Sequence, residues 1–194
     1  MVAVSESGQL AVRAGPALRA RVRTDAALVR AAQHGSAEAF DELFARHWPR
    51  AYRTACLVCA DASAAEDVAQ EAFLAAVRAL DRFDRRRPFG PWLHRIVVNR
   101  AIDHTRARAL RREVAGGALP EPAAHEPAPV DQPLMDAVAG LALEQRAVVV
   151  LRHLLGYSAS EIAAMLEIPR GTVNSRLRRG LDALAAELDE GRAP

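Results

Sequence analysis

Four arginines lie in the short segment PRGTVNSRLRRG, residues 169–180, together with small polar side chains and no acidic residue. Val173 and Leu177 are four residues apart, so on a helix they share one inward face. The remaining faces carry Arg170, Asn174, Ser175, Arg176, Arg178 and Arg179. Arginine can pair with two acceptor atoms of guanine, and Asn or Ser can bond base edges or phosphates. The segment therefore predicts a helix that binds nucleic acid.

The residues just upstream, YSASEIAAMLEI, predict a second, shorter helix. Ser158 and Glu161 have the spacing of a capping box, in which each side chain satisfies a free amide at the helix start. A tight turn is expected at Glu167–Ile168, and Pro169 suits the first turn of the next helix. A short helix, a turn and a second helix form a helix-turn-helix, whose second helix enters the major groove of DNA. The alternative is an ordinary solvated helix.

A second basic surface lies between Arg95 and Arg112, where six arginines accompany one aspartate. Phe83, Phe89 and Trp92 come just before it. Arginines beside aromatic rings can hold a phosphate backbone and stack on an unpaired base. The aromatic residues could equally belong to a hydrophobic core, and both interpretations stay open at this point.

An acidic segment, DASAAEDVAQEAF at residues 61–73, contains four acids and no base. Asp67, Gln70 and Glu71 have i, i+3, i+4 spacing, so they share one helix face. A surface of this sign repels nucleic acid and suits a basic protein partner. The alternative is an ordinary solvated helix face.

The composition favours an all-α fold. Hydrophobic residues make up 51% of the 194 residues but aromatic ones only 5%, so alanine and valine supply much of the total, and alanine favours helices. No apolar run approaches the roughly 18 residues that span a bilayer, and the N-terminus lacks the apolar core of a secretory signal. We therefore expect a cytoplasmic protein without membrane insertion.

The chain divides into two small helical domains and a flexible linker. Residues 1–24 are expected to form a disordered basic tail, residues 25–112 a first helical domain, and residues 134–190 a second. Residues 113–133 are the expected linker, because five prolines in its second part oppose regular structure. Within the domains, Ser36 and Ser63 are candidate helix N-caps.

The segment AVVVLRHLL at residues 147–155 is ambiguous, because three successive valines also suit a buried strand. Its helical neighbours and the lack of a partner strand favour a helix that ends before Gly156.

Cys56 and Cys59 form a C-x-x-C pair on a predicted helix, with His47 nine residues upstream. The pair could be a thiol sensor or half of a zinc site. Zinc needs four ligands and no second pair is present, so we favour packing in the core.

The order of three motifs resembles that of the extracytoplasmic-function (ECF) group of bacterial sigma-70-type sigma factors. They are AEDVAQEAF, then PFGPWLHRIVVNRAIDHTRAR, then LEQRAVVVLRHLLGYSASEIAAMLEIPRGTVNSRLRRGLDAL. The resemblance covers residues 25–112 and 134–188. It implies sigma region 2 in the first domain, sigma region 4 in the second, and promoter-specific transcription initiation without catalysis, cofactor or metal.

The resemblance also implies roles for particular residues. Core RNA polymerase would bind Asp67, Gln70 and Glu71 through the clamp helices of its beta-prime subunit. The beta subunit of the polymerase also contacts sigma factors of this group. The −10 promoter element would be recognised and melted by Phe89, Trp92, Arg95, Asn99, Arg100 and Arg106. The −35 element would be recognised by Arg170, Thr172, Asn174, Ser175, Arg176 and Arg179. Sigma factors of this group are commonly held by an anti-sigma factor.

Some positions depart from the family's common pattern. Gly90 stands where a basic residue is frequent, Asn174 where Lys is usual, and Gly180 where Ala is usual. These differences are expected to alter promoter preference.

Three other functions compete with a sigma factor. A stand-alone DNA-binding regulator would use only the helix-turn-helix, which leaves the acidic helix unexplained. An enzyme is disfavoured because the chain has no phosphate-binding glycine loop, H-E-x-x-H or G-x-S-x-G motif. A redox or zinc switch would make Cys56 and Cys59 the primary feature.

Overall fold

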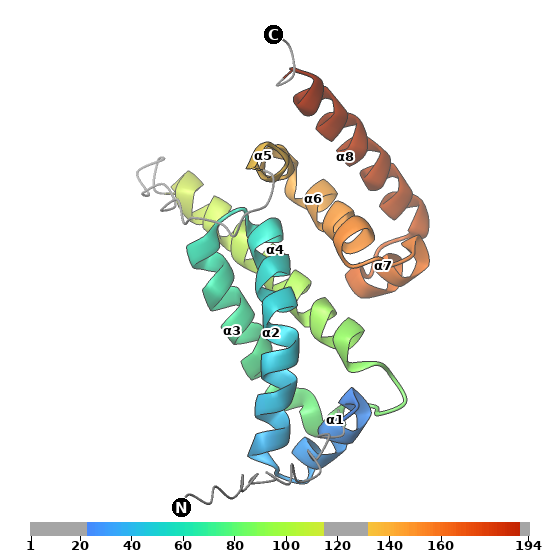
Figure 1. The fold of residues 1–194 in the computed structure, drawn as a ribbon. Helices are drawn as coiled ribbons and strands as arrows, with labels where there is room; N and C mark the ends of the chain where they lie inside the picture. The colour runs from blue at the N-terminus through green and yellow to red at the C-terminus, as the bar shows by residue number, and fades with distance from the viewer. Residues whose placement is uncertain (1–22, 115–131, 191–194) are drawn as a thin grey trace, which may run out of the picture.

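The computed structural model describes residues 23–114 and 132–190, and every regular element in these ranges is helical (Figure 1). The N-terminal block, residues 23–114, contains α1 (Asp25–Gln33), α2 (Ala37–Cys59), α3 (Ala62–Ala79), the 3-10 turn η1 (Leu80–Arg82) and α4 (Phe89–Val114). The C-terminal block, residues 132–190, contains α5 (Gln132–Gly140), α6 (Leu143–Val149), the π-helical turn η2 (Val150–Leu154), α7 (Ala159–Leu166) and α8 (Arg170–Glu190).

The expected tail, residues 1–24, lies almost entirely outside the described residues, as does most of the expected linker, residues 113–133. The two flanking helices nevertheless extend into the expected linker. Helix α4 continues to Val114 and α5 begins at Gln132. Pro133 is compatible with this start, because the first turn of a helix does not use its backbone N–H groups.

Side chains cap the first three helices. The Ser36 hydroxyl accepts a hydrogen bond from the backbone N–H of Ala39, which confirms it as an N-cap. The expectation for Ser63 is wrong: Asp61 caps α3 and its carboxylate accepts from the N–H of Ala64 at 3.2 Å. The reason lies in Ala60, which ends α2 in the left-handed conformation, so the chain re-enters helix two residues earlier than expected.

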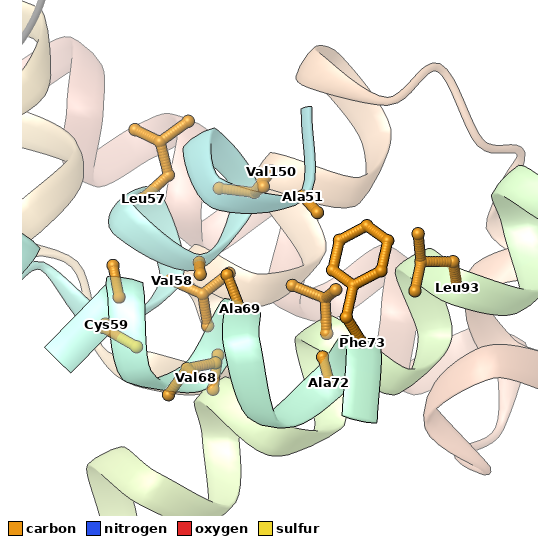
Figure 2. Close-up of a cluster of buried hydrophobic side chains, with 14 of the residues drawn as sticks. Ala51, Leu57, Val58, Cys59, Val68, Ala69, Ala72, Phe73, Leu93 and Val150 are labelled. Carbon is orange, nitrogen blue, oxygen red and sulfur yellow. The ribbon is translucent and has the colours of Figure 1, made fainter. Parts of the chain in front are cut away.

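The core of the N-terminal block forms where α2, α3 and α4 pack together (Figure 1). Helix α3 presents a mostly alanine face to it, and these short side chains let the neighbouring helices approach closely. Figure 2 shows Ala69, Ala72 and Phe73 of α3 in a cluster with Leu93 of α4. Val150 of η2 belongs to the same cluster, so the C-terminal block closes one side of this core.

The C-terminal block has the helix-turn-helix expected from the sequence. Ser158 and Glu161 form both halves of the capping box at the start of α7. Glu167, with a φ of 55°, ends α7 in the left-handed conformation and turns the chain toward α8. Residues 147–154 are helical, as expected, and Gly156 follows shortly after their end with a φ of 76°.

None of the helices in the described ranges is long and apolar enough to cross a membrane.

Gly180 of α8 lies against α6. A Cβ atom at this position would lie 2.9 Å from Cγ2 of Val149 and 3.4 Å from Cβ of Gln145. Real Cβ atoms essentially never come as near as the first of these distances, so any larger residue at 180 would push the two helices apart. The unusual glycine is therefore explained by packing.

We predict that Gly180→Ala lowers the free energy of unfolding by about 1 kcal/mol, because an overpacking cost of about 1–3 kcal/mol exceeds the helix-propensity gain of about 1 kcal/mol. In a Val149→Ala background the same change should become stabilising, since the crowding methyl group is gone. Gly171→Ala is the matched control in the same helix, where a Cβ meets nothing within 4 Å, and it should stabilise. Urea titration of the full chain measures all four variants; a stabilising Gly180→Ala in the native background would contradict this explanation.

Candidate nucleic-acid interface

Helix α8 presents the polar residues expected to contact the −35 element along its first three turns. Val173 is fully buried and Leu177 half-buried, which fixes the inward side of the helix. The exposed residues of the expected set are Arg170, Asn174 and Arg179. Its half-buried residues are Thr172, Ser175 and Arg176. The arginine-rich surface of α8 is thus open to a ligand at most of its positions.

The aromatic residues before the second basic surface form a packed cluster. Phe89 is 3% exposed, and its ring lies 5.9 Å from that of Phe83 and 5.1 Å from that of His47. This burial supports the core interpretation of Phe89 and does not fit direct contact with DNA. Trp92 is half-buried and packs on Phe83, with ring centroids 4.6 Å apart. Only the Trp92 ring could therefore meet a base without unfolding the cluster.

The arginines of α4 expected to contact the −10 element all have acidic partners. Arg95 bonds Glu167 and Arg106 bonds Glu144 at 3.1 Å. Both glutamates belong to the C-terminal block. Arg100 instead pairs with Glu71 of α3 at 3.3 Å. These three arginines of α4 are therefore each paired with an acid of the same chain.

The acidic face of α3 is exposed as expected. It carries Asp67, Gln70 and Glu71, and the side chains next to them are apolar. Leu74 is 54% exposed and Val77 is 44% exposed. An acidic patch continued by exposed large aliphatic side chains is typical of a protein-binding surface.

The two blocks meet along α4 and α2. Val98 of α4 is 1% exposed and belongs to the apolar core of the C-terminal block, together with Leu151 and Ile162. Nδ1 of His94 and the hydroxyl of Tyr157 share a buried hydrogen bond of 2.7 Å. On α2, a guanidinium nitrogen of Arg50 donates to the carbonyl oxygen of Leu154 at 3.3 Å.

A cavity of about 340 Å³ lies between α4 and the C-terminal block. Asn99 and Arg106 line one side, while Glu144 and Arg176 line the other. A residue expected to contact the −10 element therefore shares a cavity with one expected to contact the −35 element.

Sequence reasoning missed the partners that the C-terminal block supplies to α4, namely Glu144, Tyr157 and Glu167. Each lies more than thirty residues from its partner in the chain. One feature of the sequence could have indicated that α4 packs on a second block. Val97 and Val98 are adjacent apolar residues in a helix otherwise rich in arginine. A single helix with adjacent valines on different faces can enter two cores.

The two cysteines are packed rather than poised to react. Burial raises the pKa of Cys59 to about 11, and burial also raises that of Cys56. Both thiols are therefore protonated at neutral pH, and protonated thiols neither attack nor bind zinc readily. His47, the possible third ligand, bonds Asp25 at 2.9 Å. No cluster of three or more His, Cys, Asp or Glu side chains that could hold a metal ion is found within residues 23–114 and 132–190.

The environment of His94 keeps its ring neutral. Burial, reinforced by the nearby side chains of Arg50 and His47, lowers the pKa of His94 to about 4 from 6.5. Its partner Tyr157 is also buried, and burial raises the pKa of that phenol to about 12. The hydrogen bond between them therefore joins two uncharged groups throughout the physiological pH range.

We predict that His94 makes the protein less stable as the pH falls from 6.5 to 4. The unfolded chain protonates this histidine in that window while the folded chain does not, so acid favours unfolding. A pKa shift is worth about 1.4 kcal/mol per pH unit, so neutral His94 contributes about 3 kcal/mol to the free energy of unfolding. This contribution is present above pH 6.5 and is lost by pH 4. Urea titrations across this range should show a shallower pH dependence for His94→Gln than for the native chain; parallel curves would contradict the prediction.

Comparison with known proteins bears on both blocks. The family described as Sigma-70 region 2 matches residues 43–111, and the family described as Sigma-70, region 4 matches residues 131–184. The chain is 38% identical to the ECF RNA polymerase sigma factor SigM of Mycobacterium tuberculosis over 84% of each chain. It is 32% identical to the ECF RNA polymerase sigma factor SigW of Bacillus subtilis, over 82% of this chain and 94% of that one.

Two solved structures have a similar fold. The sigma factor RpoE of Bartonella quintana, in complex with the anti-sigma factor NepR, aligns with a TM-score of 0.68 at 25% identity, over 77% of this chain and 96% of that one. CnrH, in complex with the cytosolic domain of CnrY, aligns with a TM-score of 0.62 at 34% identity, over 86% of this chain and 97% of the CnrH chain. With both regions matched in order and relatives aligned over most of their length, the chain belongs to the ECF group of sigma-70-type RNA polymerase sigma factors.

Proposed function

We propose that this chain is an alternative sigma factor that binds core RNA polymerase and directs it to promoters with particular −10 and −35 elements. The N-terminal block acts as region 2 and the C-terminal block as region 4. It contributes no catalytic residue of its own, since the polymerase performs the chemistry, and it works in the cytoplasm, where polymerase and promoters are found.

The observation that carries this proposal is the exposed arginine-rich surface of α8, which the capped helix-turn-helix supports. Asn174 and Arg179 are open on it, while Val173 anchors the opposite side in the core. A helix held in this way can enter the major groove with its side chains directed at base edges. We assign contacts with the −35 element to the expected set, Arg170, Thr172, Asn174, Ser175, Arg176 and Arg179.

The two remaining surfaces complete the assignment. We place the polymerase contact on the exposed acidic and aliphatic face of α3, through Asp67, Gln70 and Glu71, because an acidic surface suits a basic protein partner. Contacts with the −10 element fall to Trp92, Arg95, Asn99, Arg100 and Arg106, while Phe89 supports Trp92 from the core. An anti-sigma factor is a further partner, since the similar sigma factor RpoE of Bartonella quintana is bound to the anti-sigma factor NepR in its solved structure.

The test of this function is transcription by core RNA polymerase from a library of random promoters, with and without the protein. We expect new transcripts whose templates share two elements at fixed spacing. Asp67→Arg should lower the yield at least tenfold, because it puts a positive charge on the polymerase-binding face. Asp41→Arg is the matched control, an equally exposed acid on α2, and should leave the yield near that of the native chain.

Two outcomes would overturn the proposal. The first is that no new start sites appear when the protein is added. The second is that the protein binds specific duplex DNA tightly without polymerase. The second result would favour a stand-alone regulator that uses only α7 and α8.

We predict that Asn174→Ala changes the base preferred at one position of the −35 element and costs about 1–3 kcal/mol of discrimination there, as for the loss of one bidentate contact. Arg178→Gln is the comparison, since this arginine is exposed on α8 but outside the assigned set. Its loss should weaken binding about equally for all sequences. Selection of promoters from the library with each variant measures both effects; an unchanged preference with Asn174→Ala would remove Asn174 from the assigned set.

A further inference from the structure

The cavity between α4 and the C-terminal block has the size and the lining of a site for a small molecule. Its volume of about 340 Å³ lies at the lower end of the range of ligand pockets, about 300–1,000 Å³. We propose that this cavity binds a small zwitterion with an apolar side chain, either a free amino acid or a dipeptide. The proposed function assigns no small molecule to the chain, and binding at this site does not depend on that function.

Two unpaired charges of opposite sign line the cavity. Within the part of the chain that the structure describes, the side chains of Arg176 on α8 and Asp103 on α4 have no ion-pair or hydrogen-bond partner. Arg176 can hold the carboxylate of a ligand and Asp103 its ammonium group, because charge-assisted hydrogen bonds are the strong ones. A zwitterion satisfies both side chains at once.

The other two charges of the lining already neutralise each other. Arg106 donates to Glu144 at 3.1 Å. This bond lowers the pKa of Glu144, and the positive charge of Arg176 lowers it further, so Arg176 lies close to the pair. The four charges of the lining sum to zero, which favours a ligand of zero net charge. A ligand with only negative charge, such as inorganic phosphate, would leave Asp103 unpaired and would be repelled by both carboxylates.

The apolar part of the lining suits an aliphatic side chain. Ile102 of α4 lines the cavity together with Leu166 and Ile168, which flank the turn between α7 and α8. All three are half-buried, so each has apolar surface left to cover. A ligand side chain that covers this surface removes it from water, which favours binding. Asn99 adds an amide that can donate to a carboxylate or accept from an ammonium group.

The cavity is open to solvent and draws its walls from both blocks. Two of its lining side chains, Asp103 and Arg106, are exposed, so a ligand can enter without unfolding the chain. The opposite wall comes from α6, α7 and α8. A ligand that contacts both walls binds only the packed arrangement and therefore stabilises the folded protein by mass action.

Isothermal titration calorimetry of the full-length chain tests the site, with leucine and leucyl-leucine as probes. At least one of them should bind with a dissociation constant below about 1 mM, and the tighter one identifies the source of the zwitterion. Its analogues without the amino group or without the carboxylate (isocaproate and isoamylamine for leucine) should bind at least about tenfold more weakly, since each leaves one charge unpaired. No binding of either probe, or equally tight binding of either analogue, would overturn the proposal.

Variants then locate the binding in this cavity. Asp103→Asn should weaken the tighter probe at least about tenfold and leave the analogue without an amino group unchanged, because that analogue has no ammonium for Asp103 to hold. Arg176→Gln should likewise spare the analogue without a carboxylate. The controls Asp41→Asn and Arg178→Gln each remove an exposed charge outside the cavity and should bind the probe like the native chain.

Equal affinities in a cavity variant and its control, with both proteins folded by circular dichroism, would contradict the assignment. The titrations contain no polymerase or DNA, so they are separate from the test of the proposed function. A chain that supports transcription but binds neither probe retains the sigma function and loses only the zwitterion site.

Discussion

Apolar packing between the two blocks is the interaction on which the arrangement of the whole molecule depends. It places Val98 of α4 in the core of the C-terminal block, and Val149 and Val150 of that block in the core of the N-terminal one. Helix α4 places Leu93 and Val97 in its own core and Val98 in the other, so one helix belongs to two cores. The polar groups near this seam must then be satisfied without water. His94 meets this requirement only at Nδ1, which shares a hydrogen bond with Tyr157; its buried Nε2 has no partner within the described residues. Burial lowers the pKa of His94 far below its ordinary value and so keeps the ring neutral.

The same seam brings two opposed requirements onto α4. Under the proposed function α4 must present positive charge to the promoter, whereas a helix packed between two blocks must not leave charges without partners. The chain meets both by placing Arg95 and Arg106 at the edge of the contact, where the glutamates of the other block reach them while water still has access. Interfaces of this kind between domains resemble transient protein contacts, which separate when a competing partner binds.

In contrast to the exposed ion pairs between the blocks, the helix-turn-helix is held by close contacts within the C-terminal block. The capping box of Ser158 and Glu161 fixes the start of α7, and the close approach at Gly180 fixes how α8 lies on α6. A recognition helix needs such support, because base contacts fail when side chains are misplaced by about 1 Å. These contacts set the positions of α7 and α8 within the C-terminal block.

The sequence by itself determined the local structure and the family. Capping residues, helical spacing and the absence of acids from residues 169–180 depend only on neighbours in the chain, so the helix-turn-helix and the exposed face of α3 could be predicted. Tertiary structure decided which polar and aromatic residues are exposed and can therefore contact a partner. Arg146 is buried at 6% exposure although it is an arginine like the others, and Phe89 is in the core although it begins the arginine-rich helix α4. The partners of Arg95 and Arg106 come from another block, and only packing between distant segments brings such charges together.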